Sequence, residues 1–225
     1  MCAKQRIALY GGTFDPVHLG HLEVARRVQE LFEIKKLLFV PAQVAPHKVG
    51  KLVSAPLHRH AMLALASQDD PTLAISTFEL ESPDRSYTID TLTHFVSEFG
   101  ETADLFFIMG ADSWSEITTW REWERLLRVV NHIVVTRPGY EIEDYPTVRD
   151  RIVDLRVSKL QALLPEGPRI FITDVVLKDI SASQIRRLAS AGRYSELTGL
   201  VSKPVATYIE KYRIYQESNE RKFNC

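Results

Sequence analysis

The chain has 225 residues, of which 45% are hydrophobic and 25% are charged. This composition is typical of a globular protein and excludes disordered, collagen-like and coiled-coil chains. Lys and Arg total 28 against 29 Asp and Glu, so the formal net charge of -1 argues against a nucleic-acid binder and requires any phosphate to be bound locally.

Short apolar runs of strand length alternate with longer amphipathic stretches along the chain. In chain order we predict a strand at 7–10, a helix at 19–33, a strand at 36–40, a helix at 57–66, a strand at 73–78, a helix at 88–99, a strand at 105–109, a helix at 113–130, and strands at 132–136 and 169–173. Two closing helices are predicted at 181–191 and 203–212, followed by a polar tail.

This alternation predicts an α/β fold: a Rossmann-like, doubly wound, mostly parallel sheet with helices on both faces and a small C-terminal helical subdomain. We expect a nucleotide-binding domain at 1–180, C-terminal helices packed on it at 181–216, and a loose tail at 217–225. Ligands of such sheets bind beyond the carboxyl ends of the strands. The proline-bearing stretch 41–56 is interpreted as a functional loop near that crevice.

The strongest local feature runs from Gly11 to His21, directly after the first predicted strand and into the first predicted helix. Glycines allow backbone amides to approach an anion, and a helix start supplies further donors and the positive end of a dipole. His18 and His21 are three residues apart, so both imidazoles can lie on one face of the first turn. The segment therefore predicts a phosphate site.

Two other interpretations of this segment remain open. Gly11-Gly12 and Asp15-Pro16 can simply form turns, with the histidines on a solvated helix start, and His-X-X-His can also bind zinc, although no third ligand stands nearby. The P-loop, the dinucleotide-binding glycine motif, His-Glu-X-X-His and Gly-X-Ser-X-Gly are absent, which argues against P-loop ATPases, dehydrogenases, zinc proteases and serine hydrolases.

The segment resembles the Gly-Gly-X-Phe-Asp-Pro-X-His-X-Gly-His motif of the nucleotidyltransferase superfamily. Nearly the whole chain is similar to the bacterial nicotinate-nucleotide adenylyltransferases, because further landmarks follow in order: Pro46-His47-Lys48, Ser86-Tyr87-Thr88, Gly110-Ala111-Asp112 with Trp120 eight residues on, Arg137-Pro138-Gly139, and Ile180-Ser181-Ala182-Ser183-Gln184-Ile185-Arg186. The resemblance implies transfer of the adenylyl group of ATP to nicotinate mononucleotide with Mg²⁺, giving nicotinate adenine dinucleotide and pyrophosphate.

The resemblance also implies roles for individual residues. Catalytic candidates are His18, His21, Lys48 and Arg186. Candidates for ATP binding are Gly11, Gly12, Thr13, Phe14, His18, His21, Gly110, Asp112, Ser181, Ser183 and Arg186, and those for the pyridine nucleotide are Tyr87, Thr88, Trp120, Arg137 and His47. Ser183 departs from the threonine common in the family but keeps the hydroxyl. No protein metal ligand is expected.

Several of these residues have structural explanations as well. Ser181 with Gln184, and Ser113 with Glu116, each fit a capping box at a helix start. Trp120 would by position alone be an amphipathic core aromatic, a role that suits Trp114 and Trp123 better. His47 and Lys48 could be solvated loop residues. His58, His60, His94 and His132 carry no motif and are assigned structural roles.

Two alternatives to this function remain, namely a shorter relative such as pantetheine-phosphate adenylyltransferase and a nucleotide-sensing module without turnover. The expected partners are the two small substrates, with no nucleic acid and no membrane, and the sequence allows a homo-oligomer. Cys2 and Cys225 support neither a disulfide framework nor a zinc site, and no apolar run approaches the roughly 18 residues of a membrane helix. We therefore expect a cytoplasmic location.

Overall fold

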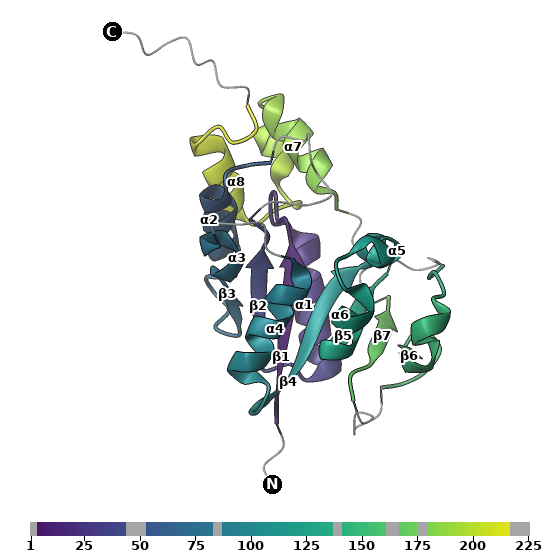
Figure 1. Ribbon diagram of the computed structural model, residues 1–225. Coiled ribbons are helices and arrows are strands. Elements are labelled where there is room, and N and C mark those ends of the chain that lie inside the picture. Colours follow the sequence, from purple (N-terminus) through teal and green to yellow (C-terminus); the bar gives the residue numbers. More distant parts are fainter. Residues whose placement is uncertain are drawn as a thin grey trace.

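A seven-stranded sheet forms the centre of the protein in a computed structural model that describes residues 4–43, 53–82, 87–136, 141–160, 167–174 and 180–216 (Figure 1). All neighbouring strands run parallel, in the order β3-β2-β1-β4-β5-β7-β6. The strands are β1 (Gln5–Gly12), β2 (Lys36–Pro41), β3 (Leu73–Ile75), β4 (Ala103–Gly110), β5 (Asn131–Val135), β6 (Ile152–Asp154) and β7 (Ile170–Thr173). The predicted α/β class with a mostly parallel sheet is confirmed.

Helices cover both faces of the sheet, with α1 (Leu19–Phe32) on one face and α4 (Thr88–Phe99) and α6 (Trp123–Val129) on the other (Figure 1). The side chains of β1 alternate between the two faces. Ala8 is buried in the cluster that includes α1, whereas Ile7 and Leu9 are buried in the cluster that includes α4 and α6. Burial on both faces explains why the strands are apolar runs.

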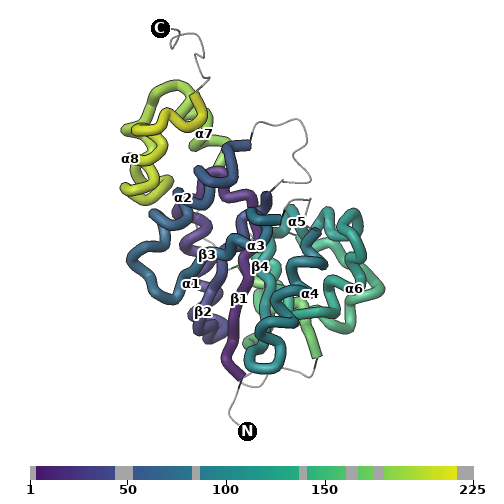
Figure 2. Tube along the Cα trace, turned by 60° about the vertical axis from the view of Figure 1, so that its left-hand side comes forward, coloured from purple at the N-terminus to yellow at the C-terminus, as the bar shows by residue number. Residues whose placement is uncertain are grey.

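The C-terminal part of the chain lies at the carboxyl edge of the sheet, where α7 (Ala182–Ser190) and α8 (Lys203–Lys211) stand beside α2 (Pro56–Ser67) (Figure 2). Their apolar residues Ile185 and Ile209 belong to the same buried cluster as β1 and α1. The division at residue 180 stays a prediction. In the described part of the chain, no helix is long and apolar enough to cross a membrane.

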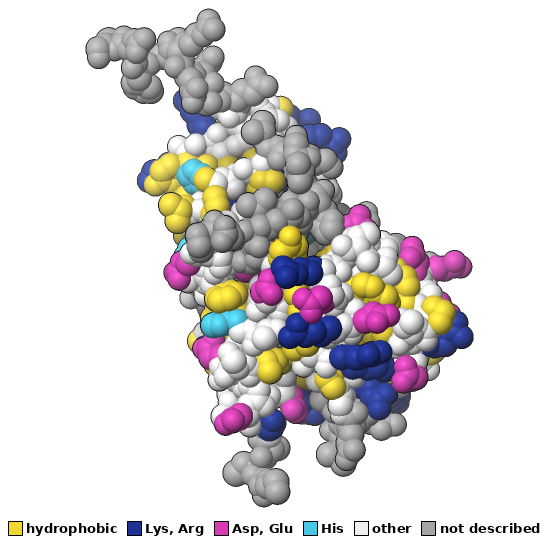
Figure 3. All heavy atoms as spheres, viewed as in Figure 1, with side chains coloured by type: hydrophobic (Ala, Val, Ile, Leu, Met, Phe, Trp, Pro, Cys, Tyr) yellow, Lys and Arg dark blue, Asp and Glu magenta, His cyan; other side chains and the backbone are white. Residues whose placement is uncertain are grey.

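The surface shown in Figure 3 mixes side chains of both charge signs. An apolar groove lies over α2 and α8, lined by Leu65, Pro204, Tyr208 and Tyr212 with two lysines at its rim.

The strand order reverses at the border between β1 and β4. After β1 the chain builds β2 and β3 on one side, and it then returns through α4 to place β4 on the other side of β1. At such a switch point the connections that follow the two strands leave toward opposite faces and open a crevice at the carboxyl edge. The strand order therefore predicts a ligand crevice between the residues that follow Gly12 and those that follow Gly110.

Three sequence predictions fail in detail. The helix at 113–130 is wrong, because the chain forms α5 (Ala111–Ser115), a 3-10 turn η2 (Ile117–Thr119) and α6, and the β-branched run at 117–119 disfavours a continuous helix. The strand at 73–78 ends at Ile75, and a new helix, α3 (Phe78–Glu81), begins where Ser76 Oγ accepts the Phe78 N–H. Strand β6 was not predicted.

Candidate active site

The two glycines after the first predicted strand are its last residues, because β1 extends to Gly12 and pairs there with β2. A Cβ on Gly11 would lie 2.8 Å from Cζ of Phe107, and one on Gly12 would lie 2.9 Å from Cζ of Phe14. Aromatic rings therefore require the absence of side chains here. The interpretation that these glycines admit an anion is not needed to explain them, and their contact with ATP stays a prediction.

The turn after β1 is held in an unusual backbone conformation. Phe14 has a left-handed φ of 50°, and its buried ring packs edge-on against Tyr10, Phe39 and His21. A left-handed φ is costly for a residue with a side chain and persists where packing over-determines it. Because the ring is in the core, only the backbone of Phe14 remains to face a nucleotide.

The histidines of the motif form a stacked pair at the start of α1. Their ring centroids are 3.7 Å apart with 27° between the planes, and the N–H of His18 donates to Nδ1 of His21 at 3.2 Å. His18 is the N-cap residue, with 9% of its surface exposed, and its Nδ1 is buried without a hydrogen-bond partner among the described residues. The pair lies at the positive end of the helix dipole.

Burial sets the protonation state of His18. Loss of solvation lowers its pKa to about 4, so the imidazole is neutral at neutral pH and presents one N–H donor and one acceptor. The structure therefore favours the neutral form of His18 in the free protein.

Helix α7 brings Arg186 to the same place from the far end of the sequence. Its Nη1 donates to the backbone oxygen of Asp15 at 2.7 Å, and its Nη2 donates to Ser183 Oγ at 3.1 Å. Ile180 lies against Gly20 of α1, where an added Cβ would be 3.8 Å from the Cβ of Ile180. The imidazole pair and the guanidinium thus share one edge of the sheet, as the sequence motifs predict.

The predicted capping boxes are not formed as expected. Ser181 is the N-cap residue of α7 but its side chain makes no capping bond. Ser113 lies inside α5, whose N-cap is Gly110, so the capping box with Glu116 is wrong.

The residues after β4 lie on the other side of the expected crevice from the turn after β1. Gly110 and Asp112 are exposed at the start of α5, and among the described residues, apart from its chain neighbours, Gly110 has no atom within 4 Å of an added Cβ. Nothing in the described protein fills the space beside Gly110, which leaves room for a ligand at the switch point. Their contacts with the base and ribose stay predictions.

Three of the candidates for the pyridine nucleotide, Tyr87, Thr88 and Trp120, lie on two neighbouring segments of the described chain. Tyr87 is the N-cap residue of α4 and Thr88 is its first residue, while Trp120 is half-buried in the extended break between η2 and α6. The guanidinium carbon of Arg121 lies 4.8 Å from the centroid of the Tyr87 ring, which joins the two segments. Trp114, by contrast, is fully buried in the core, as expected.

Arg59 of α2 was not singled out from the sequence, although it is 1% exposed and organises the turn. Its guanidinium donates to three backbone carbonyls, those of Thr13 at 2.9 Å, Gln43 at 3.1 Å and Ser54 at 3.1 Å. Glu79 lies nearby, and burial raises its pKa to about 7 while Arg59 opposes that shift. Backbone acceptors leave no sequence signal. The one available sign was that Arg59 shares a helical face with the apolar residues Met62 and Leu63.

Three predicted site residues, His47, Lys48 and Arg137, lie outside the described residues. Among the histidines without a motif, His132 is fully buried with Nδ1 2.9 Å from the Val130 oxygen, and His58 Nδ1 lies 2.8 Å from the Tyr208 hydroxyl. Within the described ranges no three His, Cys, Asp or Glu side chains group as metal ligands.

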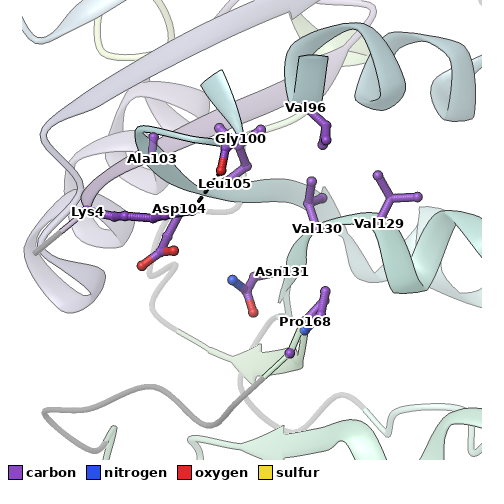
Figure 4. Close-up of a pocket in the computed structure, with 11 residues that line it drawn as sticks. Lys4, Val96, Gly100, Ala103, Asp104, Leu105, Val129, Val130, Asn131 and Pro168 are labelled. Atoms are coloured by element: carbon purple, nitrogen blue, oxygen red, sulfur yellow. Dashed lines mark hydrogen bonds between the residues drawn. The ribbon is translucent and has the colours of Figure 1, made fainter. Parts of the chain in front are cut away.

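A separate hollow of about 400 Å³ lies at the opposite edge of the sheet, beside the starts of β4 and β5 (Figure 4). Lys4 reaches across it to donate to the Gly100 oxygen at 2.8 Å, and the valines of α4 and α6 line it with Asp104. It lacks the convergent donors of the crevice, so the crevice is the better candidate for a nucleotide site.

The fold and the site define a nucleotidyltransferase, and comparison with known proteins agrees. A family model described as cytidylyltransferase-like matches residues 9–188. The chain therefore belongs to the cytidylyltransferase-like family.

Within that family the chain groups with the nicotinate-nucleotide adenylyltransferases. It is 37% identical to a probable nicotinate-nucleotide adenylyltransferase of Thermoanaerobacter sp. over 96% of both chains, and 38% identical to a Thermus thermophilus protein of that name over 94% of this chain and 100% of that one. The fold is shared with Plasmodium falciparum nicotinic acid mononucleotide adenylyltransferase complexed with NaAD, with a TM-score of 0.72, 20% identity, and coverage of 94% of this chain and 97% of that chain.

Proposed function

We propose that this protein transfers the adenylyl group of ATP to nicotinate mononucleotide, giving nicotinate adenine dinucleotide and pyrophosphate. The relatives at 37–38% identity support the substrates. The single observation that carries the chemistry is the convergence of the stacked His18–His21 pair and Arg186 at the β1–β4 switch point. Those groups converge where a triphosphate would meet a helix N-terminus.

The reaction needs no nucleophile from the protein. An oxygen of the 5′-phosphate of nicotinate mononucleotide attacks the α-phosphorus of ATP, and the bond from that phosphorus to the bridging oxygen breaks to release pyrophosphate. A phosphate monoester has a second pKa of roughly 6, so the attacking group is already largely a dianion at neutral pH. Catalysis then consists of alignment and of neutralising the charge on the departing pyrophosphate.

The imidazoles and the guanidinium supply that neutralisation. A neutral His18 donates an N–H to a phosphate oxygen, and the approaching polyanion favours the protonated ring, so nucleotide binding raises its pKa from about 4. Arg186 is half-buried and already fixed on the turn, which reduces the ordering needed when phosphate binds. Lys48 is proposed as a further cationic contact.

The rest of the crevice divides between the two substrates. Gly110 and Asp112 are proposed to bind the adenosine, with the Asp112 carboxylate accepting from ribose hydroxyls. Trp120 is proposed to stack on the pyridine, and the backbone amides around Thr88 and after Trp120 to receive its carboxylate. Arg121 over the Tyr87 ring supports this assignment, because it holds the two amide-bearing segments together.

ATP-dependent nucleotidyltransferases generally need a divalent metal, and we propose Mg²⁺. The residues fit an ion that the substrate carries in, because both carboxylate oxygens of the buried Asp15 already accept hydrogen bonds and the exposed Asp112 joins no group of metal ligands among the described residues. Phosphate oxygens and water are the expected ligands, and Mg²⁺ would offset phosphate charge there.

Pyrophosphate release across phosphate acceptors tests the proposal. We expect rapid release with nicotinate mononucleotide, and slower release with nicotinamide mononucleotide and with phosphopantetheine. Equal rates with the two pyridine nucleotides would contradict the proposed specificity for nicotinate mononucleotide. No pyrophosphate release with any acceptor would indicate a nucleotide sensor. A cytoplasmic location and a homo-oligomer stay predictions.

A further inference from the structure

Asp15 has a buried carboxylate, and three other residues donate hydrogen bonds to its side-chain and backbone oxygens. It is 3% exposed and follows Phe14 in the turn after β1. Its Oδ2 accepts the Ser54 N–H at 3.2 Å, its Oδ1 accepts the Tyr215 hydroxyl at 2.8 Å, and its backbone oxygen accepts Arg186. A carboxylate at this depth is stable only when such donors replace water.

Tyr215 reaches this carboxylate from the other end of the chain. It lies four residues after α8 ends at Lys211, in a turn where Tyr215 has a φ of 75° and Arg213 a φ of 50°. Burial and the charge of Asp15 raise the pKa of Tyr215, so its hydroxyl stays protonated and donates. Two left-handed residues in one turn persist only where the surrounding structure holds them. The same applies to Phe14, which precedes Asp15 on the other side of the contact.

The contact is joined to the proposed phosphate-binding guanidinium through a single residue, Asp15. The chain of bonds runs from the Tyr215 hydroxyl to the Asp15 carboxylate, and from the Asp15 backbone oxygen to Arg186 Nη1 at 2.7 Å. Arg59 of α2 holds the same turn directly through the Thr13 carbonyl, and it also donates to the Ser54 carbonyl, whose residue donates its N–H to Asp15 Oδ2. What Tyr215 adds is control of the Asp15 end, where Arg186 is attached.

We propose that Tyr215 is a positioning residue, which acts through Asp15 to set Arg186 for the triphosphate. The inference rests on the proposed function, because it assigns Arg186 to ATP. Without the hydroxyl, Oδ1 of Asp15 is buried without its donor, and the turn backbone at Asp15 can shift to bring that oxygen to water, which would displace the backbone carbonyl that accepts Arg186.

Tyr215→Phe tests the inference, with Tyr208→Phe as the matched control. Phenylalanine keeps the ring and its packing. Tyr208 also donates or accepts a 2.8 Å hydrogen bond, but its partner is His58 on the outer side of α2 and α8, away from the turn. For each variant, kcat and KM for Mg-ATP and for nicotinate mononucleotide are measured at a temperature well below unfolding, with thermal unfolding followed in parallel.

We expect Tyr215→Phe to lower kcat/KM for Mg-ATP about tenfold, with a smaller change in KM for nicotinate mononucleotide, while Tyr208→Phe lowers the melting temperature without changing kcat/KM. In an Arg186→Gln background, Tyr215→Phe should have little further effect on kcat/KM, although its effect on the melting temperature should persist.

Three results would overturn the inference: unchanged kinetics in Tyr215→Phe, the same loss of kcat/KM in both backgrounds, or failure of Tyr215→Phe to fold, since the hydroxyl would then serve the fold. Failure of the proposed function is distinguishable, because the wild-type protein itself would not form nicotinate adenine dinucleotide.

Discussion

The neutral state of His18 predicts a specific dependence of stability on pH. An unfolded histidine has a pKa of about 6.5, whereas burial lowers the pKa of His18 to about 4. Between these values the unfolded chain binds a proton that the folded protein does not, so folded stability falls as the pH falls from about 6.5 toward 4. Through His18 alone, the free energy of unfolding is about 2 kcal/mol lower at pH 5 than at pH 8.

His18→Asn removes this titration and keeps a residue favoured at helix N-caps. The free energy of unfolding, from urea denaturation at pH 8 and pH 5, is compared between variant and wild type, so that other titrating groups cancel. We expect the free energy of unfolding of the variant, relative to that of the wild type, to be about 2 kcal/mol higher at pH 5 than at pH 8. A difference that stays constant with pH would show that His18 is not held neutral by burial, and would refute the reasoning about its donor role.

Three further predictions concern other residues. Burial raises the pKa of Glu79 to about 7, so the folded state loses stability as the pH rises from about 4.5 through 7. In chemical denaturation, Glu79→Gln should therefore have a free energy of unfolding up to about 3 kcal/mol above that of the wild type at pH 8.5, and no such advantage at pH 4. Gly11→Ala should lower the free energy of unfolding by about 1–3 kcal/mol because its Cβ would lie 2.8 Å from the Phe107 ring, and an unchanged urea midpoint would contradict that contact. Trp120→Ala should raise KM for nicotinate mononucleotide up to about tenfold and leave KM for ATP nearly constant in steady-state assays, as loss of one stacked ring predicts, whereas equal changes in both would argue against stacking on the pyridine.

The parts of the fold that the sequence predicts well are those with strong local signals. Helix α4 matches its predicted bounds of 88–99 because its apolar stripe is regular and Gly100 follows it. The motif from Gly11 to His21 indicates the candidate site because it is contiguous and lies at a strand-to-helix junction. The start of α6 was missed, because the turn before it depends on a left-handed Glu122 where the sequence has no glycine or proline.

The contacts that organise the candidate site are less visible in sequence. Arg59 bonds to backbone carbonyls, which any residue could provide. Tyr215 meets Asp15 across 200 positions, and its half-buried setting shows no periodic signal. Arg186 was assigned to the site of the histidine pair from the family resemblance, and the expectation that ligands of a doubly wound sheet bind at the carboxyl ends of its strands agrees with that assignment.

The turnover of His21→Ala at saturating Mg-ATP and nicotinate mononucleotide tests most directly whether the stacked imidazoles act on the phosphates. If they stabilise developing charge as preorganised donors do, kcat should fall by about 10²–10³ while circular dichroism and the urea midpoint show a folded protein. A folded variant with near wild-type kcat would contradict the account.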